Sequence, residues 1–213
     1  MSTAPAIRPS YLLEFDEAGH RYFVNGDEKM STTQVLHWAG LIDTTWFKEW
    51  HRWRGSETHK AIAIWNKAGK IDKRTVDPRI KGYLEAALKW QKDTKFTPLF
   101  VEERRYDPIL DICGTADLIG YFAGGNPIVD VFVDFKTNDW KQGQATSRYQ
   151  LASYGHMFAP KEVFRRIEVV LGPDGNYGPV NSFPVDTYIA DVNAFSAMVI
   201  VAKLRKEMGL IDL

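Results

Sequence analysis

Apolar and polar residues follow two different patterns along the chain, and the change falls near residue 95. Before this point, apolar residues recur with helical spacing over residues 44–68 and 77–93. We expect Gly55 to interrupt the first of these helices. Asp77 followed by a proline marks the start of the second, because proline fits the first position of a helix.

The stretch before these helices predicts smaller elements. Residues 1–10 are expected to form a loose tail, and residues 11–26 two short strands joined by a glycine turn. Ser31 or Thr32 can cap a short helix that follows. Residues 11–95 are therefore predicted to form a hairpin and a mostly helical lead.

After residue 95 the apolar runs are short and bounded by turn residues, which is typical of strands. Three strands, a helix, a fourth strand, a loop rich in Gly and Pro, and a terminal helix are predicted over residues 96–107, 109–124, 127–137, 144–158, 165–171, 172–184 and 188–208. Gly-Gly-Asn-Pro at 124–127 supplies the turn between the second and third strands. This order predicts a mixed sheet with helices packed on it, an α/β or α+β fold, in a single domain of 213 residues.

Composition and charge narrow the class of protein. With 45% hydrophobic and 13% aromatic residues the chain can bury a real core. Its formal net charge of +0 gives no overall attraction to nucleic acid, so a polyanion site would have to be a local basic patch. Cys113 is the only cysteine, which excludes an internal disulfide, a cysteine-only zinc site and a four-cysteine iron–sulfur cluster within one chain.

The sequence also carries expectations about location. The first ten residues lack the basic start and apolar run of a signal peptide. We expect no window to approach the roughly 20 apolar residues of a membrane span. The chain is therefore predicted to be soluble and cytoplasmic, with no membrane partner, and a single cysteine fits a reducing compartment.

Candidate chemistry begins with three Asp-x-Lys triplets, at residues 27–29, 93–95 and 134–136. The first lies in a polar turn and the second at a helix end, where solvated charges are expected. The third ends an apolar strand that is predicted to be central. Charges at such a position lose their hydration, so they need a compensating partner, which is often a metal ion.

Asp117 is the natural partner, because it interrupts the apolar strand that precedes this one. If the two strands pair through the Gly-Gly turn, Asp117 and Asp134 lie nearly opposite each other. Carboxylates about 5 Å apart repel unless a cation lies between them or one is protonated. Hard oxygen ligands suit Mg²⁺ or Mn²⁺, with Lys136 near a water or a phosphate oxygen. The alternative is a plain Asp117–Lys136 ion pair.

Four motifs occur in order along the chain: G-x-x-x-H at 55–59, G-x-x-D at 114–117, D-x-K at 134–136 and Q-x-x-x-Y at 150–154. Together they resemble the PD-(D/E)XK nuclease superfamily, and most closely its RecB-type branch with the related, lambda-exonuclease-like phage enzymes. The resemblance spans about residues 55–155. It implies a restriction-endonuclease-like core, with a central mixed sheet flanked by helices.

The resemblance implies a set of metal ligands for Mg²⁺ or Mn²⁺. These are His59, Asp117, Asp134, the backbone carbonyl of Phe135 and a glutamate on the preceding strand. Either Glu102 or Glu103 could supply the last, since the two point to opposite sides, and Glu102 is favoured. Members of the branch that hold an iron–sulfur cluster have flanking cysteines, which this chain lacks, so no such cluster is expected. Without the resemblance, the sequence favours a solvated helix histidine at position 59 over a metal ligand.

The remaining catalytic roles follow from the same resemblance. Asp117 and Asp134 would serve the reaction together with Lys136, which would orient or activate the attacking water. Gln150 and Tyr154 would lie one turn apart on one helical face, near the scissile phosphate or the lysine. They could instead be a plain helix side-chain pair.

A tryptophan stripe at 46, 50 and 53 lies at helical spacing just before His59, and such stripes are usually core. Cations are interleaved with it, so we also consider a DNA-binding surface formed by Arg52, Trp53 and Arg54.

The sequence thus predicts a metal-dependent DNA exonuclease of the phage recombination type, with its catalytic core at 96–171 and a loop and C-terminal helix at 172–213. Partners implied are DNA, a single-strand annealing protein and, as in some relatives, further copies in a ring; a phage-encoded enzyme would act in the host cytoplasm. The alternatives are an endonuclease or single-strand-specific nuclease of the same fold, an inactive DNA-binding module, and a metal-stabilised structural protein.

Overall fold

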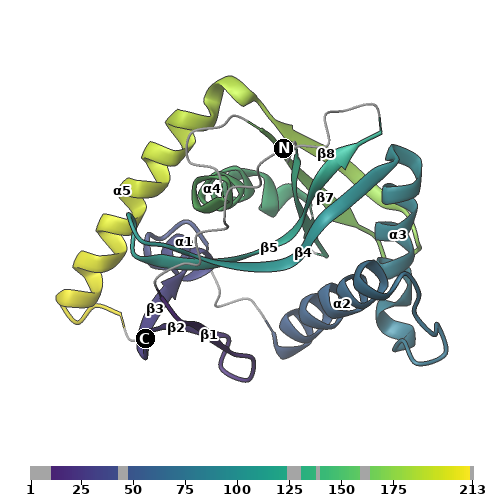
Figure 1. Cartoon of the computed structure of the whole chain (residues 1–213), viewed down its shortest axis with the longest axis horizontal. Coiled ribbons are helices and arrows are strands. Elements are labelled where there is room, and N and C mark those ends of the chain that lie inside the picture. Colours follow the sequence, from purple (N-terminus) through teal and green to yellow (C-terminus); the bar gives the residue numbers. More distant parts are fainter. Residues whose placement is uncertain (1–10, 43–47, 124–130, 138–139, 159–163, 212–213) are drawn as a thin grey trace, which may run out of the picture.

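The computed structural model describes residues 11–42, 48–123, 131–137, 140–158 and 164–211, without the side chains of 140–145. The predicted tail, the turn at 124–127 and Trp46 lie outside the described residues. The chain forms a mixed sheet with helices on both faces (Figure 1). This confirms the predicted fold class of mixed α and β structure.

The sheet has eight strands in the order β1-β2-β3-β5-β6-β7-β8, with β4 paired to β5 off this path. Two pairs, β3–β5 and β6–β7, are parallel, and the others are antiparallel. The strands are β1 (Leu13–Asp16), β2 (Arg21–Val24), β3 (Asp27–Ser31), β4 (Phe96–Asp107), β5 (Ile112–Phe122), β6 (Val131–Lys136), β7 (Arg165–Leu171) and β8 (Tyr177–Phe183).

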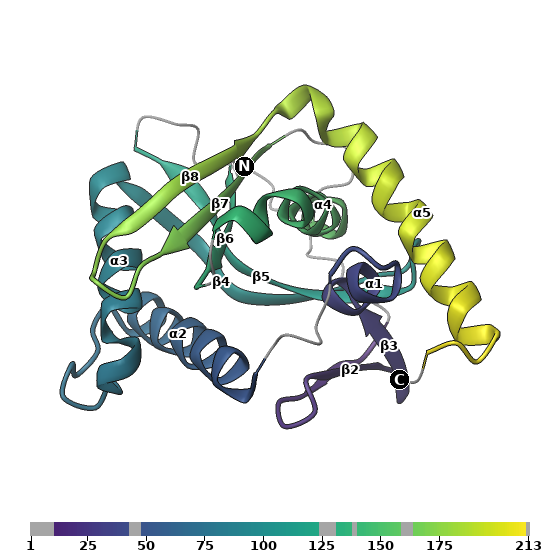
Figure 2. The same cartoon turned by 180° about the vertical axis from the view of Figure 1, so that it is seen from behind.

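Helices cover the two faces of the sheet separately, as both cartoons show (Figures 1 and 2). One face packs against α2 and α3, and the other against α4, which α1 and α5 flank. The helices are α1 (Thr32–Trp38), α2 (Glu49–Ala68), α3 (Pro78–Thr94), α4 (Trp140–Phe158) and α5 (Tyr188–Glu207), preceded by a 3₁₀ turn (Val185–Thr187).

Strand β6 shows how alternation sorts side chains between these faces. Val131, Val133 and Phe135 join the core beneath α2 and α3, whereas Phe132 joins the core beneath α4. Because side chains alternate along a strand, Asp134 follows Phe132 toward α4. Phe135 therefore fills the core while its neighbours on either side carry charge.

Several predicted boundaries are confirmed. Ser31 caps α1 through a capping box with Gln34, and Asp77 caps α3 by accepting from the Arg79 backbone N–H. The hairpin of β1 and β2 and the bounds of β4 are also as predicted.

Three sequence predictions are wrong. Gly55 does not interrupt α2, which is continuous through it; a glycine costs a helix only about 1 kcal/mol. The polar segment Asp27–Ser31 forms β3, because pairing with two neighbouring strands outweighs its weak pattern. The Gly- and Pro-rich loop contains β8, whose Pro179 is tolerated on an outer strand of the sheet.

The terminal helix is more apolar than expected. By length and composition alone, Val185–Glu207 would suffice to cross a membrane. An 18-residue window of this segment has a mean hydropathy of 1.4, and 28% of the window is buried. Phe195, Val199 and Ala202 of this helix pack into a core cluster with α1. Its opposite side exposes Ile200 and other apolar side chains. The expectation that no window approaches a membrane span was therefore wrong.

Candidate active site

The centre of the candidate site is the register between β5 and β6. Leu118 pairs with Val133, so the next step along the two strands brings Asp117 and Asp134 together. Asp117 and Asp134 are 9% and 1% exposed, so both carboxylates are withdrawn from water. The backbone N–H of Phe135 donates to Asp117 Oδ2 at 2.8 Å. The register thus sets the two acids nearly opposite each other on adjacent strands, but Asp134 is paired with Lys136, whereas Asp117 faces His59.

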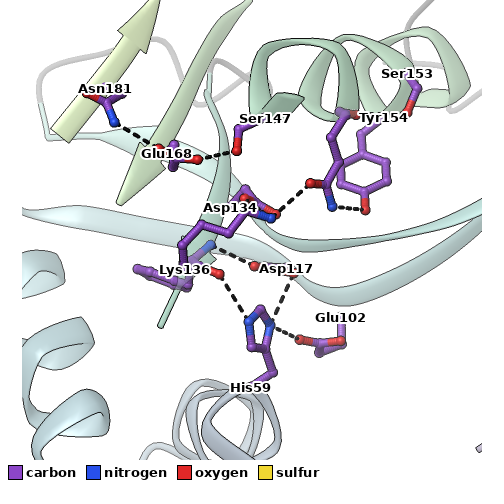
Figure 3. Close-up of polar contacts among 12 residues, drawn as sticks. His59, Glu102, Asp117, Asp134, Lys136, Ser147, Ser153, Tyr154, Glu168 and Asn181 are labelled. Atoms are coloured by element: carbon purple, nitrogen blue, oxygen red, sulfur yellow. Dashed lines mark hydrogen bonds and ion pairs between the residues drawn. The ribbon is translucent and has the colours of Figure 1, made fainter. Parts of the chain in front are cut away.

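A second group of side chains meets Asp117 from the side of α2 (Figure 3). His59 Nδ1 lies 3.3 Å from Asp117 Oδ1 and 3.6 Å from Glu102 Oε1. The three residues come from α2, β5 and β4, and their ligand atoms all lie within 4.8 Å of one another. Together they form the one cluster of three or more His, Cys, Asp or Glu side chains with metal-ligand spacing in the described part of the chain.

An unusual backbone conformation at Glu102 accompanies the approach of its side chain to this cluster. Glu102 has a φ of +50°, in the left-handed region that non-glycine residues rarely adopt. It lies between the paired residues Val101 and Glu103 of β4. Glu103 instead pairs with Arg105 at 3.1 Å. Strained backbone of this kind concentrates at functional sites, and here it brings one of the two adjacent glutamates to His59.

The two ring nitrogens of His59 have different partners. Nδ1 faces the two carboxylates, and Nε2 lies 3.1 Å from the backbone oxygen of Phe135. A neutral ring protonated on Nε2 would donate to this carbonyl and present the Nδ1 lone pair to the carboxylates, which is how metal-binding histidines are commonly oriented. In this structure the Phe135 carbonyl therefore orients His59, and it lies on the other side of the ring from Asp117 and Glu102.

Lys136 lies in a separate chain of contacts on the α4 side of the sheet. Its Nζ is 2.7 Å from Asp134 Oδ2 and donates to Gln150 Oε1 at 2.9 Å. Gln150 Nε2 in turn donates to the Tyr154 hydroxyl at 2.9 Å. The alternative Asp117–Lys136 ion pair is not what the structure shows, because Lys136 pairs with Asp134. Gln150 and Tyr154 are one helical pair, and they also reach the lysine.

Gly114 of the G-x-x-D motif makes room for Tyr154. A Cβ at this position would lie 2.8 Å from Tyr154 Cε1 and 2.9 Å from Thr32 Oγ1. The absence of a side chain therefore allows the tyrosine ring of α4 to lie against β5. The two motifs, far apart in sequence, are parts of one packing arrangement.

The charged groups perturb one another strongly. Burial, reinforced by Asp117 and opposed by Lys136, raises the pKa of Asp134 to about 6. Burial also opposes ionisation of Asp117, but the adjacent His59 lowers its pKa below the ordinary value. Burial alone would lower the pKa of His59, yet Asp117 and Glu102 raise it well above its ordinary value. The two carboxylates thus stabilise positive charge at the position where a cation could bind.

Lys136 remains a cation in this environment. Burial opposes its charge, but the Asp134 carboxylate raises the pKa of the ammonium above its ordinary value. An ammonium has three N–H donors, and two partners, Asp134 and Gln150, are identified here. The third donor can serve a water or a phosphate oxygen.

The residues fit a divalent cation. His59, Glu102 and Asp117 offer one imidazole nitrogen and carboxylate oxygens, a donor set that Mg²⁺ or Mn²⁺ can use. Asp134 does not belong to this group, because its carboxylate is paired with Lys136. The backbone of Phe135 connects the two halves, since its N–H reaches Asp117 and its oxygen reaches His59.

Sequence reasoning missed Glu168. This glutamate of β7 is fully buried and pairs in register with Asp134. It accepts from Asn181 Nδ2 at 2.8 Å and from the Ser147 hydroxyl (Figure 3). The signal was available, because Glu168 is a lone acid within an apolar strand, the same feature that singled out Asp117.

The three predicted DNA-binding residues, Arg52, Trp53 and Arg54, lie on α2, one to two helical turns before His59. Arg52 is exposed, and Trp53 and Arg54 are half-buried. Arg54 Nε donates to Thr137 Oγ1 at 3.3 Å, so this segment of α2 touches the chain directly after Lys136.

Comparison of the whole chain with protein-family models and with curated proteins finds no match in either.

Proposed function

We propose that the protein is a divalent-metal-dependent DNA nuclease, and specifically an exonuclease used in recombination or DNA end processing. The observation that carries this proposal is a pair of adjoining polar clusters. One is His59, Glu102 and Asp117, and the other is Asp134 and Lys136 (Figure 3). The backbone of Phe135 connects the two clusters, because its N–H donates to Asp117 and its oxygen lies 3.1 Å from His59. Burying ionisable groups opposes folding, and such groups are concentrated at functional sites.

The residues divide into two tasks. His59, Glu102 and Asp117 would hold Mg²⁺ or Mn²⁺, with Asp134 adjacent. A bound divalent ion neutralises charge on the phosphate and acidifies its water near neutral pH. Phosphodiester hydrolysis needs both, because charge builds up on the phosphoryl oxygens in the transition state.

Lys136 would position the reacting groups. The Asp134 carboxylate raises the pKa of the lysine ammonium, so Nζ is suited to donate to a water or a phosphate oxygen. Asp134 and Gln150 hold Nζ from two sides, and Tyr154 fixes Gln150. Holding the lysine from two sides restricts its rotamers and prepares the site for one geometry.

The test uses end-labelled linear DNA and covalently closed circles, each with Mg²⁺ or EDTA. We expect the linear DNA alone to be degraded, and only with metal. Cutting of circles would instead favour an endonuclease, and a preference for single-stranded linear DNA would favour the single-strand-specific alternative. Binding without hydrolysis under Mg²⁺ or Mn²⁺ would favour the inactive DNA-binding module.

The chain supplies its own control. Lys136→Ala should abolish hydrolysis, whereas Lys29→Ala changes another Asp-x-Lys triplet, whose lysine pairs with Asp111 at 3.0 Å. Surface ion pairs contribute only about 0–1 kcal/mol, so the Lys29 variant should fold and cut like the wild type. Equal activity in all three proteins would contradict the assigned role of Lys136.

A further inference from the structure

We propose that the start of α2, with Arg79 at the start of α3, forms a surface that stacks and grips an unpaired DNA strand beside the active site. The proposal rests on the proposed nuclease function, since it names the form of DNA that this site receives. It is defined by Trp50, Trp53, Arg52, Arg54 and Arg79, which we call the strand surface. From the sequence, the tryptophan stripe could be either part of the core or part of a binding surface.

The strand surface begins at the active site. Arg54 Nε donates to Thr137 Oγ1 at 3.3 Å, and Thr137 directly follows Lys136. His59 lies on the same helix, about one turn further on. A strand bound along the start of α2 would therefore lie within about one to three helical turns of His59 and beside the residue that follows Lys136.

The tryptophans form a stack that is not sealed into the core. Trp50 and Trp53 have ring centroids 5.1 Å apart and an interplanar angle of 25°. Trp53 is half-buried against the core, but Trp50 is 37% exposed. A stacked pair with an accessible indole offers a flat surface to a base, and every base has such a face regardless of sequence.

Arg79 holds this stack in place. Its guanidinium carbon lies 4.1 Å from the Trp53 ring centroid and 5.3 Å from that of Trp50. Its Nε and Nη2 donate to the Asp77 carboxylate at 3.0 and 2.7 Å. Because Asp77 uses this donor edge while the guanidinium lies over the rings, Arg79 is a positioning residue for the stack.

The phosphate contacts fall to the other cations. Arg52 is exposed on the same helix, and Arg54 lies over the Tyr83 ring at 5.4 Å with further donors beyond its bond to Thr137. Glu49 and Glu57 lie nearby on α2, and Glu57 pairs with Lys60 at 3.0 Å. The surface therefore combines aromatic faces with local cations in a chain whose formal net charge is +0.

A groove next to Trp53 gives room for a neighbouring nucleotide. It encloses about 740 Å³ between α2 and the segment that leads into α3. Trp53, Ile64 and the cations Lys60 and Lys70 line it, together with Glu57, Asp72 and Asp77. Each of these carboxylates is paired with a cation, Asp72 with Arg74 at 2.8 Å, so none of the three presents an uncompensated charge to a strand.

The test is equilibrium binding of a labelled single-stranded oligonucleotide and of a blunt duplex, in EDTA so that nothing is cut. We expect Trp50→Ala to weaken single-strand binding by about tenfold or more, because stacking contributes about 1–3 kcal/mol per base. Trp50→Phe should retain most of the affinity. Arg52→Ala should lower the salt dependence by about 0.7 per lost phosphate contact, and Lys67→Ala, an exposed cation at the far end of α2, should not.

The outcomes separate this proposal from the proposed function. Unchanged single-strand affinity in both Trp50→Ala and Arg52→Ala, with normal thermal unfolding, would overturn the strand surface and leave the nuclease intact. Equal loss of duplex and single-strand binding would overturn the preference for an unpaired strand. Single-strand binding that depends on Trp50, in a protein that never hydrolyses DNA, would support the surface and contradict the nuclease.

Discussion

The backbone N–H of Phe135 donates to the side chain of Asp117 at 2.8 Å, so one carboxylate both joins two strands and faces the metal-binding cluster. These two tasks can be separated by substitution. Asp117→Asn keeps an acceptor for the N–H but loses the charge, whereas Asp117→Ala leaves a buried donor unpaired. The second loss costs about 1–3 kcal/mol.

We therefore expect Asp117→Ala to lower the free energy of urea unfolding by about 1–3 kcal/mol, and Asp117→Asn to lower it less. We expect Mn²⁺ to raise the melting temperature of the wild-type protein, and both variants should lose this increase. Calorimetric titration with Mn²⁺ and thermal unfolding with and without EDTA would check this. Wild-type Mn²⁺ stabilisation in Asp117→Asn would show that the carboxylate is not a ligand.

Two glycines in the four motifs should respond oppositely to alanine. At Gly114 an added Cβ would lie 2.8 Å from Tyr154, so the ring must move and its contact with Gln150 weakens. Overpacking of this kind costs about 1–3 kcal/mol, and hydrolysis should fall with it. At Gly55, inside α2, the nearest atom would be Thr137 Oγ1 at 4.0 Å, so alanine should fit.

Gly55→Ala should consequently raise the free energy of unfolding by up to about 1 kcal/mol, the usual gain of alanine over glycine in a helix. Denaturant titrations of the two variants measure the contrast directly. Destabilisation by both changes would mean that Gly55 has a role beyond helix formation, such as close approach of a substrate.

Cys113 should be chemically silent in the folded protein. It is fully buried on β5, and burial raises the pKa of its thiol to about 12, against about 8.5 in an unfolded chain. Between these values only the unfolded chain ionises, so this group lowers stability as the pH rises from about 8.5 toward 12. A thiol reagent at pH 8 should label the protein only after urea is added. Immediate labelling in native buffer would contradict this burial.

The sequence predicted the parts of the site that follow from strand and helix periodicity. Asp117, Asp134, Gln150 and Tyr154 could be placed because two strands joined by a short turn and one helical face fix their neighbours. Lys136 likewise had to share a side with Asp134. What brings these residues together is local and repetitive, so the sequence pattern carries it.

Other features depend on tertiary context that no local pattern records. The choice of Glu102 over Glu103 rests on a φ of +50°, and the pairing of Lys136 with Asp134 on the relative positions of three elements. Strand β8 was missed because Gly178 and Pro179 weaken its pattern, and pairing with β7 supplies what propensity does not. Arg166, the second of two adjacent arginines at the start of β7, is fully buried, which nothing in the local sequence pattern indicates.

That buried arginine leads to a prediction about stability alone. Arg166 Nη1 lies 2.7 Å from Asp191 Oδ2, and Arg148 binds the other oxygen of the same carboxylate. The three side chains connect β7, α4 and α5 on the side of the sheet away from His59. Removing one member of a buried ion pair leaves its partner charged and desolvated, which costs about 3–5 kcal/mol.

Asp191→Ala should therefore lower the free energy of unfolding by about 3–5 kcal/mol, measured by urea titration. Asp72→Ala is the matched control, because it removes an exposed carboxylate that also binds an arginine, Arg74, at 2.8 Å, and should leave the free energy of unfolding nearly unchanged. If Asp191→Ala still folds at low temperature, its remaining folded fraction should bind Mn²⁺ with wild-type affinity. Weaker Mn²⁺ binding per folded molecule would show instead that this network also supports the cluster of His59, Glu102 and Asp117 across the sheet.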